Sequence, residues 1–160
     1  MKKVMLFLLV FSLFLPVYSF ALLGSYTVSS GTWSPTNPQA GLQYYGNNRY
    51  KLTLEATSNG SGDASITISD LGMLDIAGYS CVVVDPDGTD TPDDNFDLSI
   101  TDSNGSEILT GGQGTNLSNS TTTSIYLDWT HVWDSMTISL SGMGDSKKAT
   151  ITIVFDVYYP

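Results

Sequence analysis

The sequence predicts an all-β fold: a single antiparallel β-sandwich of jelly-roll or Greek-key type with about eight strands. Apolar and polar residues alternate with a period of two in five segments, which is typical of strands that are buried on one face and solvated on the other. Glycine, asparagine and proline gather between these segments, at the spacing of an all-β sandwich. No window of ten residues has a helical period, and residues 70–77 allow one helical turn at most.

In chain order, the first strand is predicted at residues 25–29, and a loop with two prolines follows at residues 31–48. Alternation then predicts strands at residues 49–56 and 63–69, joined by a turn of glycine, serine and asparagine. A continuous apolar run predicts a buried strand at residues 80–84.

The second half begins with an alternating strand at residues 95–101. Asn104-Gly105 then predicts a tight type I′ hairpin turn into a short strand at residues 107–109. A loop rich in glycine and serine follows at residues 110–123, and the last three strands are predicted at residues 124–129, 135–140 and 150–159. The final strand carries one charge, Asp156, so we expect it at the centre of a sheet or in contact with another copy of the chain.

Alternation also predicts which side chains face the core. The expected core residues are Tyr50, Leu52, Leu54, Ala56, Ala64, Ile66, Ile68, Phe96, Leu98, Ile100, Met136, Ile138, Leu140, Ile151, Ile153, Phe155, Val157 and Tyr159. Cys81 is the only cysteine, which excludes an internal disulfide, and its apolar surroundings favour a core residue over a reactive thiol.

Residues 1–21 have the pattern of a secretory signal peptide. Lys2 and Lys3 precede an apolar stretch that ends at Pro16, and small residues before Ala21 predict cleavage after that alanine. The apolar stretch is short for a membrane span, which needs about 20 residues. The predicted organisation is therefore a signal peptide at residues 1–21 and one β-sandwich domain at residues 22–160, with no membrane segment after cleavage and a secreted or extracellular location.

The charge of the chain excludes one class of partner. The net charge is −10, and residues 22–160 reach −12 because only four of the six basic residues remain against sixteen acidic ones. Such a surface repels phosphate backbones, so nucleic-acid binding is not expected.

The segment from Asp85 to Asp97 concentrates aspartates and is a candidate cation site. Carboxylates at close spacing can turn onto one calcium ion, and the candidate ligands are Asp85, Asp87, Asp90, Asp93 and Asp94. The glycine and glutamate positions of an EF-hand are not met, and aspartates also favour turns. We prefer a solvated turn between two strands, and structural calcium remains the alternative; no other cofactor is expected.

Aromatic residues suggest a second kind of site. Sugars stack on aromatic rings, and the candidate sugar-binding residues are Trp33, Trp129 and Trp133, with Tyr44 and Tyr45 as further members of such a surface. We prefer the alternative interpretation, which is packing within the sandwich, where large aromatic side chains bury much area. Coplanar exposure of the tryptophans on one face would favour sugar binding, and burial would favour packing.

No catalytic constellation is apparent. His131, the only histidine, lies between Trp129 and Trp133, and nothing in the sequence places a nucleophile and a carboxylate around it. The sequence therefore predicts a protein that is not an enzyme.

Part of the chain resembles a family of small phage virion proteins. The resemblance spans roughly residues 79–157 and is carried by Asn95, Phe96, Asp97, Thr101, Asp102, Gly105, Leu109, Gly112, Gly114 and Asn116. It implies a non-enzymatic structural or attachment role in a phage head or tail, or in a surface assembly, with self-association or docking on a larger assembly. The alternative is a secreted carbohydrate-binding module.

Overall fold

The computed structural model describes residues 24–158, apart from the side chains at positions 73–74, 77–80, 129 and 158. The predicted signal peptide lies outside this range and stays a prediction. Within it, ten strands form two antiparallel sheets that pack face to face, with no α-helix and two short 3₁₀ turns. The predicted antiparallel β-sandwich is confirmed. No helix among the described residues is long and apolar enough to cross a membrane.

One sheet has four strands in the order β1-β5-β9-β7. Its members are β1 (Tyr26–Ser30), β5 (Ala64–Ile68), β9 (Met136–Ser141) and β7 (Asp97–Asp102). Strands from both halves of the chain are thus neighbours, because the chain crosses repeatedly between the two sheets. This connectivity is the one expected for a jelly-roll sandwich.

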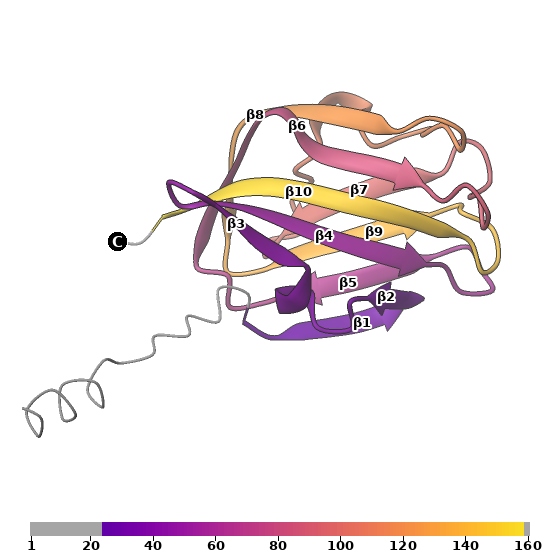
Figure 1. The fold of residues 1–160 in the computed structure, drawn as a ribbon, viewed down its shortest axis with the longest axis horizontal. Coiled ribbons are helices and arrows are strands. Elements are labelled where there is room, and N and C mark those ends of the chain that lie inside the picture. Colours follow the sequence, from indigo (N-terminus) through magenta and orange to yellow (C-terminus); the bar gives the residue numbers. More distant parts are fainter. Residues whose placement is uncertain (1–23, 159–160) are drawn as a thin grey trace, which may run out of the picture.

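The other sheet has six strands in the order β2-β4-β10-β6-β8, with β3 also paired to β4. Its members are β2 (Thr32–Ser34), β3 (Leu42–Gly46), β4 (Arg49–Thr57), β6 (Met73–Pro86), β8 (Thr123–Trp133) and β10 (Lys148–Tyr158). Figure 1 looks onto this six-stranded sheet, with β5, β7 and β9 of the four-stranded sheet behind it.

The core lies between the two sheets and is built by the alternation seen in the sequence. On β4, for example, Leu52 and Leu54 are each 1% exposed, while Lys51 and Thr53 reach the outer face. The predicted core faces of β4, β5, β7, β9 and β10 are all buried within the described residues, and Tyr50 packs against them from a half-buried position. Burying this apolar area supplies most of the stabilisation of such a fold.

Strand β10 lies at the centre of the six-stranded sheet, between β4 and β6. This strand was expected either at the centre of a sheet or in contact with another copy of the chain, and the central position is the one observed. Nine residues of β10 pair with β4, from Lys148 opposite Thr57 to Asp156 opposite Arg49. A strand paired on both sides presents no free edge to a second chain.

Three local expectations are wrong. The loop expected at residues 31–48 contains β2 and β3, which share one edge of β4: β2 pairs near Thr57, and β3 pairs near Arg49. A 3₁₀ turn at Pro38–Gly41 separates them, and Gly41 lies against β4 so closely that a Cβ would fall 2.2 Å from the main-chain oxygen of Thr53. Strands of three to five residues on either side of a segment with two prolines carry too little alternation to be recognised, and they form by pairing with the long strand β4.

The other two errors concern β6 and the hairpin. The strand expected at residues 80–84 begins earlier, at Met73, inside the segment where one helical turn at most was allowed, and this longer β6 pairs with both β8 and β10. The turn at Asn104-Gly105 is present, but only Gly105 has a positive φ (77°), so it is not of type I′. The carboxylate of Asp102 accepts the main-chain N–H groups of Asn104 and Ser106 there, and the returning chain forms a single bridge from Glu107 to Thr101 in place of a strand.

Candidate functional site

The outer face of the six-stranded sheet carries a shallow depression next to β3. Two hollows of about 450 and 390 Å³ share the side chains of Tyr45 and Arg49. We call their combined surface the Tyr45 depression; its side chains are Tyr45, Arg49, Lys51, Val83, Thr152, Val154 and Asp156. They come from β3, β4, β6 and β10, four strands that lie next to one another in the sheet.

Tyr45 forms one wall of the Tyr45 depression, and its side chain is 57% exposed. The hydroxyl of Tyr45 donates a hydrogen bond to Oε1 of Gln43, two residues earlier on the same face of β3 (3.2 Å). Tyr44 points to the opposite face of β3, where its ring lies 5.0 Å from that of Tyr50, which stacks on Phe155. Alternation along β3 therefore places the two adjacent tyrosines on opposite faces; both are exposed (Tyr44 60%), and Tyr45 is the one of the two that lines the depression.

Arg49 and Asp156 form a bidentate ion pair beside Tyr45. The Nε and Nη2 atoms of Arg49 donate to the two carboxylate oxygens of Asp156 at 2.9 and 3.0 Å. These residues are 107 positions apart in the chain and meet because β4 and β10 pair in this register. The hydrogen bond and the negative charge of Asp156 raise the pKa of Arg49 above its usual value, and Arg49 stays fully charged. Its planar fork is thus held in one orientation over the depression.

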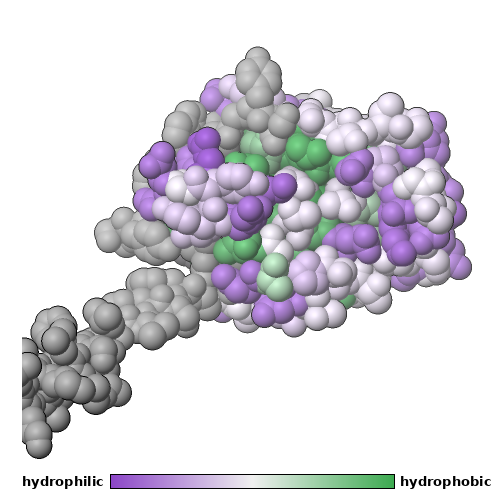
Figure 2. Space-filling model, in the orientation of Figure 1, coloured by the Kyte–Doolittle hydropathy of each residue, from purple (hydrophilic) through white to green (hydrophobic). Residues whose placement is uncertain are grey.

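The floor of the Tyr45 depression is apolar. Val154 lies opposite Lys51 on β4, and Thr152 lies opposite Val83 on β6. These side chains face outward because their neighbours Val82, Val84, Ile151 and Ile153 fill the core. Figure 2 shows hydrophobic surface in the middle of this face, with hydrophilic surface around it. An apolar floor with a few polar groups at its edge is typical of a small-molecule site.

A row of charged side chains crosses the same sheet. The register aligns Arg49 on β4 with Asp156 on β10, then Asp75 on β6, then His131 on β8. Asp75 is only 3% exposed, and its Oδ1 atom is in direct hydrogen-bond contact with Nδ1 of the exposed His131. Nothing in the sequence indicates this pairing, because the two residues lie 56 positions apart. In the part of the chain that the structure describes, no hydroxyl or thiol group is hydrogen-bonded to His131.

The three tryptophans do not form one surface. Trp33 on β2 is 4% exposed and belongs to the core, since it lies opposite Ala56 on the buried face of β4. Trp133 on β8 is 57% exposed, and the side chain of Trp129 lies outside the described residues. Strands β4, β10 and β6 separate Tyr45 on β3 from Trp133, about 19 Å at the usual strand spacing. Among the aromatic residues singled out from the sequence whose side chains the structure describes, Tyr45 lines the depression on the six-stranded sheet.

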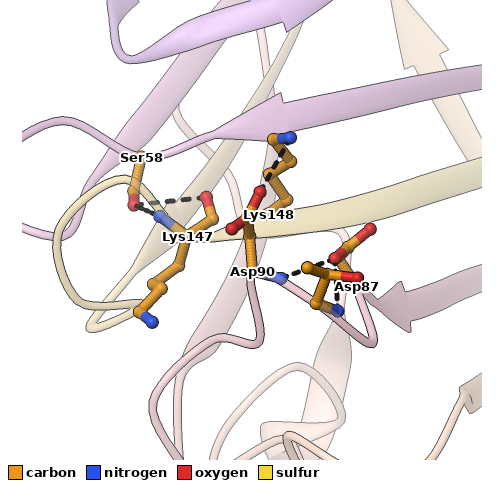
Figure 3. A network of polar contacts seen from close by, with 6 residues as sticks. Ser58, Asp87, Asp90, Lys147 and Lys148 are labelled. Carbon is orange, nitrogen blue, oxygen red and sulfur yellow. Dashed lines mark hydrogen bonds and ion pairs between the residues drawn. The ribbon is translucent and has the colours of Figure 1, made fainter.

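The acidic segment is a loop between β6 and β7 whose carboxylates have separate partners. Asp87 accepts the main-chain N–H groups of Thr89 and Asp90, both at 2.7 Å, and these bonds lower the pKa of the Asp87 carboxyl. Asp90 forms an ion pair with Lys148 at 2.9 Å, and next to it Ser58 binds the main chain of Lys147 (Figure 3).

The other carboxylates of this segment lie elsewhere. Asp85 accepts a hydrogen bond from Thr122 at 2.6 Å, Asp94 accepts one from the main chain of Asn119, and Asp93 lies against Gly144. Residues 24–158 contain no group of three His, Cys, Asp or Glu side chains that could hold a metal ion. The structure thus does not bring the five aspartates together, and structural calcium stays an untested alternative to the solvated turn.

Cys81 is a core residue, as expected. It is 1% exposed, and its thiol donates to the main-chain oxygen of Ile125 on β8 at 3.5 Å. Burial raises the pKa of this thiol, which keeps it protonated and unreactive.

Sequence comparison yields no family model and no curated protein that matches this chain. Several solved structures are similar in fold. Chitosan-binding module 1 of a chitosanase/glucanase from Paenibacillus sp. IK-5 has a TM-score of 0.48 and 12% identity, over 87% of this chain and 97% of that one. The family 32 carbohydrate-binding module of NanJ from C. perfringens, in complex with galactose, has a TM-score of 0.45 and 15% identity, over 82% and 91%. A fucose-binding module from Streptococcus pneumoniae, SpX-3, has a TM-score of 0.44 and 17% identity, over 85% and 94%.

The expected membership of a phage virion family is wrong. The solved structures named above are carbohydrate-binding modules and not virion proteins, so the expected structural role in a phage head or tail and the expected virion location are not supported. The misleading residues were those of β7 and the loop after it, where a strand, a glycine turn and a glycine-rich loop recur in unrelated sandwiches. Self-association stays a prediction.

Proposed function

We propose that this chain is a non-catalytic carbohydrate-binding domain that acts outside the cell and binds sugar in the Tyr45 depression. The observation that carries the proposal is the position of Tyr45, an exposed ring beside a bidentate Arg49–Asp156 pair and an apolar floor. The apolar face of a sugar ring stacks on an aromatic side chain, and its hydroxyls exchange hydrogen bonds with charged groups at the edge.

The polar groups suit hydroxyl recognition. Arg49 has N–H groups beyond the two that bind Asp156, and the carboxylate oxygens of Asp156 keep lone pairs that can accept from a hydroxyl. Because Asp156 already fixes the guanidinium, a bound sugar loses little affinity to ordering this side chain. The main-chain turn at Gly46 and Asn47 closes the end of the depression.

The extracellular location rests on the signal peptide predicted at residues 1–21. Intact mass of the protein recovered from its native source tests this part of the proposal. A species that keeps residues 1–21 would contradict it.

The test of binding is a titration of the purified domain with a panel of neutral and acidic oligosaccharides. Tyr45→Ala should weaken binding of whichever sugar is recognised by about tenfold or more, since a central aromatic contact contributes on the order of 2 kcal/mol. The matched control is Tyr44→Ala, which removes the adjacent tyrosine on the other face of β3. It should lower stability through lost packing on Tyr50 and leave affinity unchanged.

Two outcomes would contradict the proposal. One is that no sugar of the panel binds the domain. The other is that Tyr45→Ala and Tyr44→Ala weaken binding equally, which would place the site elsewhere.

A further inference from the structure

Basic residues are scarce in this protein, and half of those in the described part of the chain lie in one place. Residues 24–158 contain Arg49, Lys51, Lys147 and Lys148 as the only lysines and arginines, in a chain whose net charge is −10. Arg49 and Lys51 are two positions apart on β4, so their side chains leave the same face about 7 Å apart. Both line the Tyr45 depression.

Arg49 and Lys51 differ in whether a carboxylate neutralises their charge. Arg49 is held by Asp156, and Lys148 at the other end of the sheet is held by Asp90. Lys51 has no ion-pair partner within residues 24–158, and its cross-strand neighbours are neutral: Gln43 on β3 and Val154 on β10. The only carboxylate lining the depression, that of Asp156, is already engaged by Arg49. The Tyr45 depression therefore carries one uncompensated positive charge on an otherwise acidic molecule.

We propose that the sugar recognised here carries a carboxylate, and that the ammonium group of Lys51 binds that carboxylate while the sugar ring stacks on Tyr45. This inference rests on the proposed carbohydrate-binding function and names the class of sugar: a uronic acid or another carboxylated sugar. Lys51 is half-buried beside the apolar floor of the depression, and a charge-assisted hydrogen bond to a ligand carboxylate is stronger there than on a fully solvated surface.

The arrangement also discriminates against other anions. One unpaired cation matches one carboxylate, whereas polyphosphates and nucleic acids need several cations and meet the repulsion of the acidic surface. That repulsion acts over about 8 Å at physiological salt, so a single carboxylate in contact with Lys51 is attracted locally despite the net charge.

The experiment compares each acidic probe with its own methyl ester. Short oligomers of galacturonate, glucuronate and mannuronate, and sialic acid, are titrated into the domain by calorimetry without divalent cations, alongside their methyl esters and neutral hexose oligomers. The ester keeps the sugar and removes the charge. At least one free acid should bind about tenfold more tightly than its ester, the scale of a charge-assisted hydrogen bond.

Lys51→Gln should abolish this preference, so that the acid and the ester bind alike. Lys147→Gln is the matched control, because Lys147 also lacks an ion-pair partner within residues 24–158 and does not line the depression. That variant should keep the preference.

Failure of the inference is distinct from failure of the proposed function. If esters or neutral hexoses bind as tightly as acids, and Tyr45→Ala still removes binding, the site binds sugar but the inference is overturned. A preference for acids that survives in Lys51→Gln also overturns it. If no probe binds, the carbohydrate-binding function itself fails and the inference fails with it.

Discussion

The outer faces of the two sheets are built differently. On the four-stranded sheet, a row of threonines runs across all four strands, at Thr27, Thr67, Thr137 and Thr101, and serines fill the neighbouring row. On the six-stranded sheet, the corresponding positions near β3 hold a tyrosine, an arginine, a lysine and an aspartate over valines. The outer face of the four-stranded sheet thus carries short hydroxyl side chains in regular rows. The outer face of the six-stranded sheet carries side chains of different sizes and contains the Tyr45 depression.

The difference lies in where the hydrogen-bonding groups find partners. On the four-stranded sheet, the hydroxyls of Thr67 and Thr137 bond each other at 2.8 Å, and those of Ser65 and Ser139 do so at 2.9 Å. Cross-strand pairs of this kind stabilise the sheet and leave little unsatisfied. On the six-stranded sheet, the Arg49–Asp156 pair keeps spare capacity and Lys51 has no ion-pair partner among the described residues. A face whose polar side chains form hydrogen bonds with one another stabilises the sheet. A face that keeps polar or charged groups without such partners can use them to bind a ligand.

The largest effect on stability among the outward-facing polar groups is expected at His131. Replacing it with alanine leaves the buried carboxylate of Asp75 without the imidazole that contacts it, which should lower the free energy of unfolding by about 1–3 kcal/mol. Urea denaturation followed by tryptophan fluorescence measures the change. Thr130→Ala is the control on the same strand, since its hydroxyl bonds only the main chain of Asp128. Equal losses in the two variants would show that Asp75 does not depend on His131.

A smaller effect is expected on the four-stranded face. Thr67→Val keeps the shape and the strand preference of the side chain but removes half of the pair with Thr137, which should cost about 0.5–1.5 kcal/mol. Changing both threonines to valine should recover most of this loss, because no hydroxyl is left without its partner. The same urea measurement decides, and sugar affinity should be unchanged in both variants. A weaker sugar affinity in either would mean that the four-stranded face also takes part in binding.

The smallest effect is expected in the acidic loop, which lies off both faces and depends on pH. The main-chain N–H groups of Asp90 and Thr89 lower the pKa of Asp87 below its unfolded value, so the unfolded chain binds more protons and the contribution to stability grows as pH rises. At neutral pH, Asp87→Asn should melt slightly below the unchanged protein. The gap should close as pH falls below about 4, where the carboxyl becomes protonated in the unfolded chain and then in the folded one. Melting curves from pH 7 to pH 2 test this, and a gap that widens in acid would contradict the assigned cause.

The sequence alone predicted most of the long strands and their buried faces, because alternation is a local property. Residues of β4 such as Leu52 and Leu54 face the core whatever strand lies beside them, since side chains of a strand alternate between its two faces. The short strands β2 and β3 escaped recognition because three to five residues are too few to show a reliable period. The resemblance to virion proteins was misleading because it rested on local strand and turn patterns, which many sandwiches share.

Only part of the candidate site could be predicted from the sequence. Alternation placed Arg49 and Lys51 together on the solvated face of one strand, and Tyr45 stood out as one of several aromatic residues. Which of these form a site depends on pairing: β10 brings Asp156 to Arg49 across 107 positions, β6 brings Val83 beside Thr152, and β2 buries Trp33. The sequence by itself determined which side chains point inward and outward along each long strand, because that follows from backbone geometry. The tertiary structure alone decided which outward side chains become neighbours, because strand order and register are set by the packing of the whole sandwich.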